Sequence, residues 1–488
     1  MGTREYKLWA HQIDAVEKSL KSDSYAFFMD PGVGKTATTI RSICERMNML
    51  QRYHKVLIFA PPVVLSNWRR EFKVFSEIDP SQVVVVYGPG KARAKLIEET
   101  KSKILITNYE SLLMKEVFEA LKKWAPDVIV FDESHRIKNP QASRTKKAIE
   151  LADKAKHKYL LTGTPILNSP MDLFAQFRAL DGGDTFGKNF FIFRAKYFYD
   201  KNAGMPKHMH FPDWRLRPGS LDLFNLIIHR KGSIARKAEC LELPPLVKKR
   251  IEVELSPAQK RAYEEMKEDF ITFFEGGASV AQLAITKALR LQQILSGFIR
   301  IDNGDTQVDA PFEDNPRATA LKEILSNILE STEEKVIIWA VFKQNYKDIA
   351  HVCNELNAKF VELHGEVSGK NRDESVNSFN DDPNVRVLIG HPGSGGIGVN
   401  LVAASYSIFY SRSFSLEFDI QAEARNYRGG SERHSSITRI DLVAADTLDD
   451  IILRRLASKQ QITEHVLKNI VEELKGNERS NEYQIQQS

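Results

Sequence analysis

The sequence has few cysteines, no long apolar run and no strong excess of charge of one sign. Its three cysteines, Cys44, Cys240 and Cys353, lie far apart and form no CxxC pair or Cys/His cluster with zinc spacing. Neither a disulfide framework nor a structural zinc site is therefore indicated. No apolar run could span a bilayer, and the first residues contain no apolar signal core. We expect a soluble, cytoplasmic protein that makes no membrane contact.

The charge balance narrows the function classes only slightly. The 69 Lys and Arg residues stand against 64 Asp and Glu residues, which gives a formal net charge of +5. This mild excess fits a nucleic-acid partner, and it fits a slightly basic cytosolic enzyme equally well. A length of 488 residues with 42% hydrophobic content predicts a globular protein of about three domains.

Short apolar runs alternate with helical stretches in two parts of the chain. This pattern predicts, in each part, a parallel sheet covered by helices on both faces. The strands expected in the first part are 25–29, 56–60, 83–87, 104–107, 127–131 and 158–162. Those expected in the second part are 336–341, 359–363, 385–389, 406–410 and 437–443. The predicted fold class is α/β with two lobes.

Between about residues 185 and 330 the pattern is first rich in aromatics and then helical. We interpret this region as helical insertions and the link between the lobes, with one helix starting at Ser256-Pro257. The aromatic run from Phe186 to Tyr199 predicts hydrophobic packing of an insertion, and a strand-separating wedge is the alternative. The polar tail, residues 476–488, is expected to be disordered.

A candidate phosphate-binding loop follows the first expected strand. The run Met29-Asp30-Pro31-Gly32-Val33-Gly34-Lys35-Thr36 also opens an expected helix. In that setting backbone N–H groups of Gly32, Val33 and Gly34 and the helix N-terminus would hold phosphate oxygens. Lys35 would reach the β and γ phosphates of ATP, and the Thr36 hydroxyl would bind Mg²⁺. The match to the consensus is imperfect, since Met29 occupies the position of its first glycine.

Two carboxylates follow the apolar strand that ends at Phe131. Asp132 and Glu133 would lie at the carboxyl edge of the sheet, where open α/β folds bind ligands. Asp132 would hold Mg²⁺, and Glu133 would orient or deprotonate the attacking water. A solvated turn with incidental acids is the alternative.

A series of segments resembles, in order along most of the chain, the motifs of helicase superfamily two, specifically its Swi/Snf-like branch. The segments are Leu8-Trp9-Ala10-His11-Gln12, Asp30 to Thr36, Ala60-Pro61-Pro62 with Asn67-Trp68, Ile106 to Glu110, the DEAH-type box Asp132-Glu133-Ser134-His135, Leu161-Thr162-Gly163-Thr164-Pro165, Leu363-His364-Gly365, Gly395 to Leu401, and Gln421 to Arg428. The sequence departs from the branch at Gly429-Gly430-Ser431, where an Ile-Gly-Gln run is usual. That departure puts in doubt any contact from the missing Gln.

This resemblance implies two tandem RecA-like lobes with a nucleotide cleft between them. The lobes would be residues 1–235, with an insertion at about 185–235, and residues 326–475, joined by a helical insertion and linker at 236–325. The chain shows no accessory region, and this economy resembles compact bacterial or phage members. We expect a monomer.

The resemblance also assigns roles on the second lobe. Arg425 and Arg428, at i and i+3 on an expected helix, would point into the cleft and neutralise charge on the γ-phosphoryl group. Gln421, one turn earlier, would position the water. Gly396 and Gly398 would let the backbone approach sugar or phosphate. On the first lobe, Gln12 would bond the adenine edge. The alternatives are a surface helix with solvated arginines, a plain tight turn, and a capping or surface Gln.

The nucleic-acid track is less sharply marked by the sequence. Candidates for backbone contacts are small polar and basic side chains: Ser66, Asn67, Arg69, Thr107 and Asn108 on lobe one, and Ser394 and Asn400 on lobe two. Arg69-Arg70 fits a solvated helix face as well. Trp68 fits a core position better than a base-stacking platform.

The function predicted from the residues and the resemblance is an ATP-dependent DNA translocase or helicase that moves on duplex or branched DNA. An RNA helicase of the same superfamily and a non-catalytic nucleic-acid clamp are the alternatives. A nuclease would need a further cluster of metal-binding carboxylates, and the sequence shows none.

Overall fold

The computed structural model describes residues 7–51, 54–163, 170–205, 212–275, 281–303, 306–367, 369–393 and 399–457. The chain divides into two compact units, Met1–Leu241 (unit 1) and Glu242–Ser488 (unit 2). Within the described ranges, no helix combines the length and the apolar character that crossing a membrane requires. The predicted tail, 476–488, lies outside these ranges.

Unit 1 is built on a seven-stranded sheet in the order β3-β4-β2-β5-β6-β1-β9, in which all neighbours are parallel. Its strands are β1 (Ser24–Met29), β2 (Val56–Phe59), β3 (Val83–Val86), β4 (Ile104–Thr107), β5 (Val128–Asp132), β6 (His157–Thr162) and β9 (Gly232–Ala235). A small antiparallel hairpin consists of β7 (Phe198–Asp200) and β8 (Trp214–Leu216). Every residue of β1, β2 and β5 is buried, which explains why these strands form continuous apolar runs.

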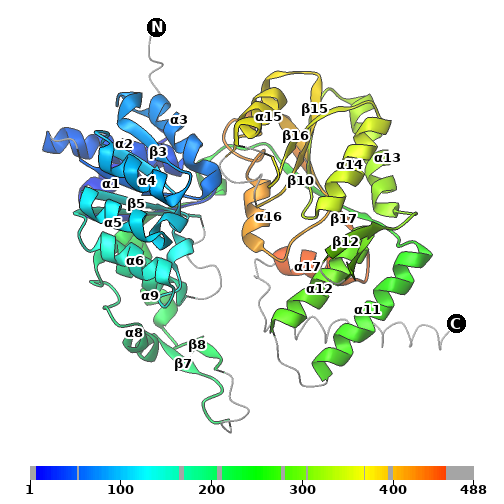
Figure 1. Cartoon of the computed structure of the whole chain (residues 1–488), viewed down its shortest axis with the longest axis horizontal. Helices are drawn as coiled ribbons and strands as arrows, with labels where there is room; N and C mark the ends of the chain where they lie inside the picture. Colours follow the sequence, from blue (N-terminus) through cyan, green and yellow to red (C-terminus); the bar gives the residue numbers. More distant parts are fainter. Residues whose placement is uncertain are drawn as a thin grey trace. The chain divides into compact units, whose positions relative to one another are not determined.

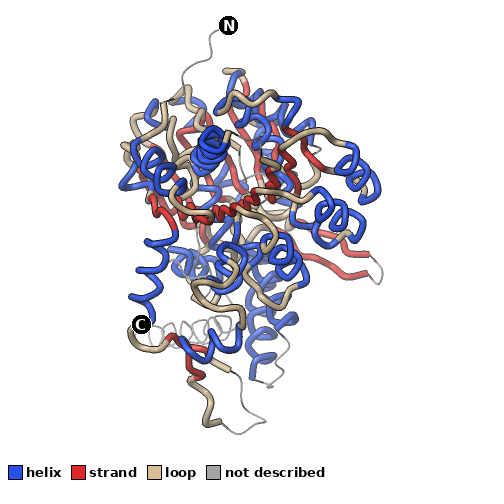
Figure 2. The backbone as a smooth tube through the Cα atoms, turned by 90° about the vertical axis from the view of Figure 1, so that its left-hand side faces the viewer, coloured by secondary structure: helices blue, strands red, loops and turns tan. Residues whose placement is uncertain are grey.

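Helices flank the sheet of unit 1 (Figures 1 and 2). They are α1 (Ala10–Leu20), α2 (Lys35–Leu50), α3 (Leu65–Phe75), α4 (Gly90–Glu99), α5 (Lys115–Trp124), α6 (Ser143–Ala152), α7 (Asp172–Asp181), α8 (Phe190–Tyr197), α9 (Ser220–Lys231) and α10 (Lys237–Cys240), with the 3-10 turns η1 (Pro62–Val64), η2 (Pro80–Gln82), η3 (Tyr109–Leu113) and η4 (Ser134–Ile137).

Unit 2 is built on a six-stranded sheet in the order β10-β17-β16-β13-β15-β14, again parallel throughout. Its strands are β10 (Leu246–Glu252), β13 (Lys335–Trp339), β14 (Lys359–Leu363), β15 (Val385–Gly390), β16 (Ala404–Phe409) and β17 (Ile437–Val443), and β11 (Phe298–Asn303) and β12 (Thr306–Pro311) form a hairpin. Its helices are α11 (Pro257–Glu275), α12 (Ala281–Leu295), α13 (Pro316–Ser331), α14 (Lys343–Glu355), α15 (Gly369–Asp381), α16 (Leu416–Glu423) and α17 (Leu448–Ala457), with the 3-10 turn η5 (Ser431–Arg433).

The predicted α/β class with parallel sheets is confirmed, and each predicted strand is present with both ends within two residues of the predicted ones. The strands β9 and β10 were not predicted. They lie where an insertion and a helical linker were expected, yet β9 pairs with β1 and β10 pairs with β17. Both are edge strands. β10 exposes Lys248, Lys249 and Arg250, so it lacks the apolar pattern of a buried strand.

The aromatic run after residue 185 mostly forms a packed core, as predicted. Phe186, Phe193, Tyr197 and Phe198 are buried, and Phe224 of α9 closes the cluster. Neighbouring ring centroids such as those of Phe186 and Phe193 lie 5.1 Å apart. This cluster attaches α8 and the β7–β8 hairpin to unit 1.

Parallel pairing puts the carboxyl ends of β1, β6 and β5 side by side at one edge of the unit 1 sheet. The loop 30–34 follows β1, Gly163 follows β6, and Glu133 follows β5. The fold therefore brings three of the predicted motifs to one edge, which is where ligands bind in open α/β sheets.

Candidate nucleotide site

The loop between β1 and α2 has the backbone of an anion cradle. Gly32 and Gly34 take positive φ values of 93° and 84°, a conformation that favours glycine. Gly34 directly precedes the first turn of α2, so free N–H groups and the positive end of the helix dipole face the loop. Thr36, half-buried in that first turn, places a hydroxyl at the same end.

Lys35 lies at the start of α2. Its Nζ donates to the carbonyl oxygen of Met29 at 2.7 Å, so the ammonium group stays over the loop. The loop is also held from β9, because the Asp30 amide donates to the Ala235 oxygen and the Asp30 carboxylate accepts from the Lys237 amide, each at 2.9 Å. Strand β9, which was not predicted from the sequence, therefore helps to fix the loop 30–34.

The N-terminus of α1 holds the loop from the other side. Gln12 is buried; its Oε1 accepts from the Trp9 amide at 2.8 Å and its Nε2 donates to the Gly34 oxygen at 3.2 Å. His11 Nε2 lies 2.9 Å from the oxygen of Val33. The capping alternative for Gln12 is therefore correct and a surface position is excluded, while its contact with adenine stays a prediction. His11 is a loop contact to which the sequence analysis gave no role.

Asp132 is the last residue of β5 and its carboxylate is buried. Oδ2 accepts from the indole Nε1 of Trp68 at 2.8 Å, and Oδ1 accepts from the Glu133 amide at 3.0 Å. Burial raises the pKa of Asp132 to about 7, and the charge of Glu133 acts in the same direction. The Trp68 hydrogen bond and the positive charge of Lys35 oppose this rise.

Glu133 has a strained backbone. Its φ of 50° lies in the left-handed region, which non-glycine residues rarely adopt. The turn that follows is held in place by two hydrogen bonds: Tyr109 donates to the Asp132 oxygen, and Ser134 donates to Gln176 of α7, each at 2.7 Å. His135 Nδ1 lies 3.4 Å from Glu133 Oε2. The two hydrogen bonds hold the backbone on either side of Glu133.

Gly163, after β6, packs directly against the loop. A Cβ atom at this position would lie 2.8 Å from Pro31 Cδ and 3.2 Å from the Met29 oxygen. Only a glycine allows this approach without displacing the loop. The rest of this motif, residues 164–169, lies outside the described ranges.

The oxygen ligands at this edge of the sheet suit Mg²⁺ bound together with a nucleotide. Mg²⁺ prefers oxygen ligands and is usually held by one or two carboxylates together with phosphate oxygens. Asp132 and the Thr36 hydroxyl supply such oxygens, and a carboxyl group with a raised pKa gains most when a cation neutralises it. Among the described residues, no group of three or more His, Cys, Asp or Glu could hold a metal ion. Phosphate oxygens and water would supply the rest of the ligands of a cation here.

In unit 2, the predicted helix with both arginines is shorter than expected. α16 ends at Glu423, so Arg425 and Arg428 lie in the turns that follow it. Their guanidinium groups still converge: Arg425 Nη1 donates to the Val399 oxygen at 3.3 Å, and Arg428 Nη1 donates to the same oxygen at 3.5 Å. Arg425 is buried and Arg428 half-buried, so the alternative of two solvated arginines is wrong.

Only one of the two polar side-chain atoms of Gln421 forms a hydrogen bond with the described residues. Its Nε2 donates to Glu417 at 2.9 Å, whereas its buried Oε1 accepts no hydrogen bond from the residues that the structure describes. Buried acceptors without a donor are uncommon in folded proteins, and a functional role is one explanation for them. Ser394, Gly396 and Gly398 lie outside the described ranges.

A network of buried charges fixes α16 to its sheet. Asp419 and Glu423 project from α16 to Arg439 of β17, with Arg439 Nη2–Asp419 Oδ1 at 2.9 Å and Nη1–Glu423 Oε2 at 2.7 Å. Arg412 binds Asp419 and Asp441, and both arginines lie over the ring of Phe409. Burial alone would raise the pKa of Asp419 and Glu423, but the neighbouring cations outweigh it and lower both pKa values. The network was not predicted, because its members lie on separate elements.

The candidates for nucleic-acid contact divide into exposed and buried side chains. Ser66, Arg69 and Asn400 are exposed, and Asn67 is half-buried with its Nδ2 bound to Glu71. Thr107 and Asn108 are instead buried, where the Thr107 hydroxyl binds the Val86 oxygen and Asn108 accepts from Arg93. Direct contact of these two side chains with a backbone phosphate is therefore a wrong prediction for this conformation.

Comparison with known proteins agrees with the motif series. The model of the SNF2-related domain matches residues 11–298, and that of the helicase conserved C-terminal domain matches residues 317–430. A chromodomain-helicase-DNA-binding protein 1-like of Danio rerio is 26% identical over 89% of this chain and 41% of its own length. An uncharacterized ATP-dependent helicase of Mycoplasma genitalium is 27% identical over 91% of this chain and 40% of its own length. The chain thus spans less than half the length of these relatives.

Among solved structures, a Sulfolobus solfataricus SWI2/SNF2 ATPase core in complex with dsDNA matches with a TM-score of 0.44. It is 24% identical to this chain, and the match covers 96% of each chain.

The charge network predicts how stability depends on Arg439. Replacing Arg439 with Gln leaves Asp419, Glu423 and Asp441 short of a cation, and we expect a loss of roughly 3 kcal/mol at pH 7 in urea unfolding of the full chain. Because the pKa values of Asp419 and Glu423 are lowered, this stabilisation is present above the ordinary carboxyl pKa of about 4 and is lost as pH falls through the lowered values. The difference from wild type should narrow toward pH 3.

Lys248→Gln is the matched control. Lys248 also binds Glu423, at 2.9 Å, but its side chain is 55% exposed, so we expect a loss below about 1 kcal/mol. Equal losses in the two variants, or a difference that widens at low pH, would contradict a buried network.

Proposed function

Because the chain belongs to the family defined by the SNF2-related domain, we propose that it is an ATP-driven DNA translocase. It would couple ATP hydrolysis to movement on duplex or branched DNA. The observation behind this proposal is the arrangement at one sheet edge of the Lys35 loop, Gly163 and the Asp132–Glu133 pair. The names of the relatives, an ATP-dependent helicase and a chromodomain-helicase-DNA-binding protein 1-like, support ATP and DNA as ligands of this chain.

Unit 1 would hold the nucleotide. Backbone N–H groups of residues 32–34 and Lys35 would bind the phosphates, and Thr36 and Asp132 would bind Mg²⁺. The cation, when bound, draws charge from the γ-phosphoryl group. Glu133, held by its strained backbone and by the following turn, would orient the attacking water and take up its proton. Gln12 and His11 keep the loop in the shape that phosphate requires.

Unit 2 would complete the site. Arg425 and Arg428, which converge on one carbonyl group, would neutralise charge on the γ-phosphoryl group in the transition state. The free Oε1 of Gln421 would accept a hydrogen bond from the attacking water. ATP would then bind most tightly when both units contact it, so it would favour a closed state through that difference in affinity. Loss of the γ-phosphate would release the closure.

DNA would contact the exposed polar side chains of both units. In unit 1 these are Ser66, Asn67 and Arg69 on α3, and in unit 2 Asn400 is the described candidate. The buried side of α3 carries Trp68, whose indole binds Asp132. This helix therefore offers a rigid connection between the metal-binding carboxylate and the DNA-facing surface. Because its proposed ligands are ATP and DNA, we propose an intracellular location. Because all residues of the proposed site belong to one chain, we propose a monomeric state.

The raised pKa of Asp132 predicts a pH dependence of Mg²⁺ binding. The metal requires the ionised carboxylate, so protons compete with Mg²⁺ below about pH 7, by about tenfold in apparent affinity per pH unit. Trp68→Phe removes a hydrogen bond that lowers this pKa and should extend the competition to higher pH. The measurement is the Mg²⁺ concentration that gives half-maximal ATPase rate between pH 6 and 8.5.

Trp124→Phe is the control, because Trp124 is also buried in unit 1. Any effect of pH on the nucleotide itself would appear equally in both variants. An unchanged profile in Trp68→Phe, or a shift to lower pH, would show that Trp68 does not tune Asp132.

The proposed activity is tested by steady-state ATPase rates over a panel of duplex, forked and single-stranded DNA and matched RNA. We expect DNA to raise the rate because it aligns the two units. Glu133→Gln should still bind ATP but lose about 100-fold or more in rate. Absence of stimulation by any polynucleotide refutes the proposal. Stronger stimulation by RNA indicates the RNA helicase, and ATP binding without hydrolysis indicates the clamp.

A further inference from the structure

One short segment of unit 1 has a strongly basic composition. The described residues between 188 and 217 contain six Lys or Arg and two Asp, a net charge of +4 against +5 for the whole chain. The basic residues are Lys188, Arg194, Lys196, Lys201, Arg215 and Arg217. Such a concentration has no role in the nucleotide site.

The fold presents this segment as a hairpin attached to the body of unit 1. Figure 1 shows β7 and β8 extending from the end of the unit that carries α8 and α9. Phe198 pairs with Leu216 on the inner face, and Tyr199 pairs with Arg215 on the outer face. Because side chains alternate along a strand, Lys201 and Arg217 continue the outer face. An aromatic ring and three cations therefore share one exposed surface.

Several of these cations are free to bind an anion. Within the described part of the chain, Lys196, Lys201 and Arg217 are exposed and have no carboxylate at ion-pair distance. Arg215 differs, because its Nε lies 2.9 Å from Asp213 Oδ1. Arg194 lies 4.0 Å from the centre of the Trp214 ring and stiffens the base of the hairpin. We call these three exposed cations, Lys196 near the end of α8 and Lys201 and Arg217 next to the ends of β7 and β8, the basic hairpin.

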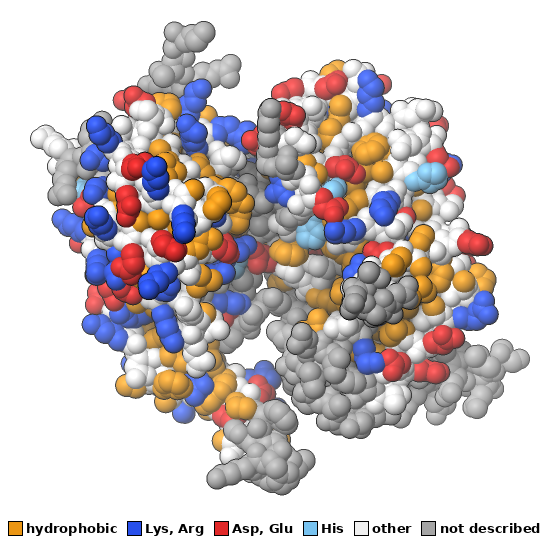
Figure 3. Space-filling model, viewed as in Figure 1, with side chains coloured by type: hydrophobic (Ala, Val, Ile, Leu, Met, Phe, Trp, Pro, Cys, Tyr) orange, Lys and Arg blue, Asp and Glu red, His pale blue; other side chains and the backbone are white. Residues whose placement is uncertain are grey.

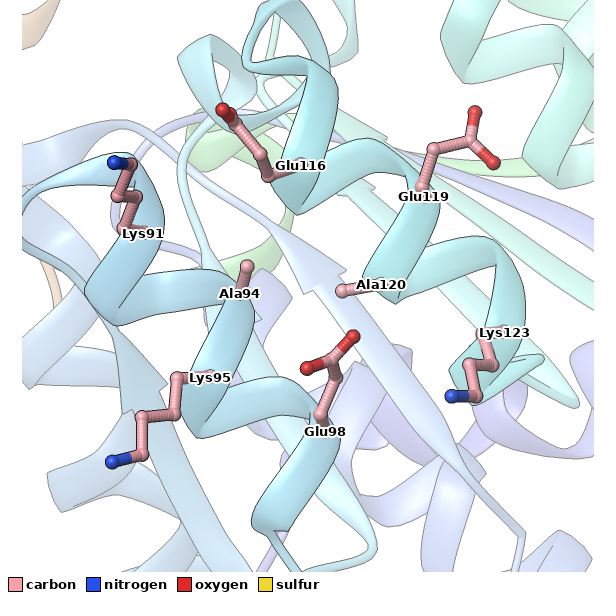
Figure 4. A pocket seen from close by; sticks show the side chains of 8 residues that line it. All are labelled: Lys91, Ala94, Lys95, Glu98, Glu116, Glu119, Ala120 and Lys123. Atoms are coloured by element: carbon pink, nitrogen blue, oxygen red, sulfur yellow. The ribbon is translucent and has the colours of Figure 1, made fainter.

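A groove between α4 and α5 shows what an ordinary charged surface of the same unit looks like. Figure 4 shows Lys91 and Lys95 on α4 and Lys123 on α5, together with the carboxylates of Glu98, Glu116 and Glu119. The lysines and glutamates are equal in number, so the groove is neutral. Figure 3 shows the same mixture of signs over this face of unit 1. The basic hairpin lacks that balance.

We propose that the basic hairpin is a second DNA contact that binds backbone phosphates of the duplex on which the protein acts. Unpaired cations on a projecting surface suit a regular array of phosphates, which gives affinity without sequence preference. None of Lys196, Lys201 and Arg217 belongs to the residues proposed to bind ATP or Mg²⁺. The contact would therefore raise affinity for DNA without taking part in hydrolysis. This inference rests on the proposed function.

The test combines DNA binding and ATPase activity of the full chain. In the variant Lys196→Gln/Lys201→Gln/Arg217→Gln, the Kd for a labelled 30-base-pair duplex should rise at least about tenfold at low salt, and the salt dependence of binding should flatten by up to about three in log–log slope. The DNA concentration for half-maximal ATPase stimulation should rise in parallel. The rate at saturating DNA and the rate without DNA should stay unchanged.

Two controls separate charge from folding. The variant Lys91→Gln/Lys95→Gln/Lys123→Gln removes as many exposed cations from the neutral groove and should leave Kd near wild type. The variant Lys196→Arg/Lys201→Arg/Arg217→Lys keeps the charge and should also bind as wild type. An unchanged Kd and salt slope in the hairpin variant, or equal weakening in the groove variant, would overturn the proposal. So would a lower saturated rate with an unchanged Kd. Wild type that no polynucleotide stimulates would instead refute the proposed function.

Discussion

A carboxylate buried at the end of β5 is the constraint around which unit 1 is arranged. Ionised Asp132 is costly away from water, and the fold lowers that cost with the Trp68 indole and the nearby charge of Lys35. Trp68 and Lys35 also connect Asp132 to other elements of unit 1. Trp68 ties α3 to the sheet edge, and Lys35 belongs to a loop that α1, β9 and Gly163 hold from three directions. The remaining cost of burying the charge appears as a pKa of Asp132 that is raised to about 7. A bound cation would stabilise the ionised carboxylate and so offset this cost.

In unit 2, ion pairs hold the candidate catalytic residues in position. Its α16 is short, and the residues that would act on ATP, Arg425 and Arg428, lie beyond its end. A short helix followed by turns would be a poor support by itself. The salt bridges from Asp419 and Glu423 to Arg439 anchor the helix to β17, and the Val399 carbonyl holds both guanidinium groups. Precise positioning here comes from charge pairs whose members are far apart in sequence.

The sequence predicted the elements that follow from a local residue pattern. It did not predict the edge strands and buried side chains that depend on partners far away in the sequence. Buried strands such as β2 and β5 are uniformly apolar, and the phosphate loop follows from its glycines and its lysine. The edge strands β9 and β10 have no such pattern, and only their partners β1 and β17 make them strands. Thr107 and Asn108 looked available for DNA because small polar residues suit both roles; their burial follows from tertiary contacts with Val86 and Arg93.

The central proposal is that one triphosphate would bind both the Lys35 loop of unit 1 and Arg425 and Arg428 of unit 2. The most direct measurement is the distance between spin labels on the two units, at Lys95→Cys and Lys347→Cys, in a chain with Cys44 and Cys240 replaced by Ser. A magnesium complex of a non-hydrolysable ATP analogue should shift the distance distribution to shorter values, and Arg425→Ala/Arg428→Ala should abolish the shift while the analogue stays bound. A bound analogue that leaves the distances unchanged, or that shifts them equally in the arginine variant, would contradict the claim.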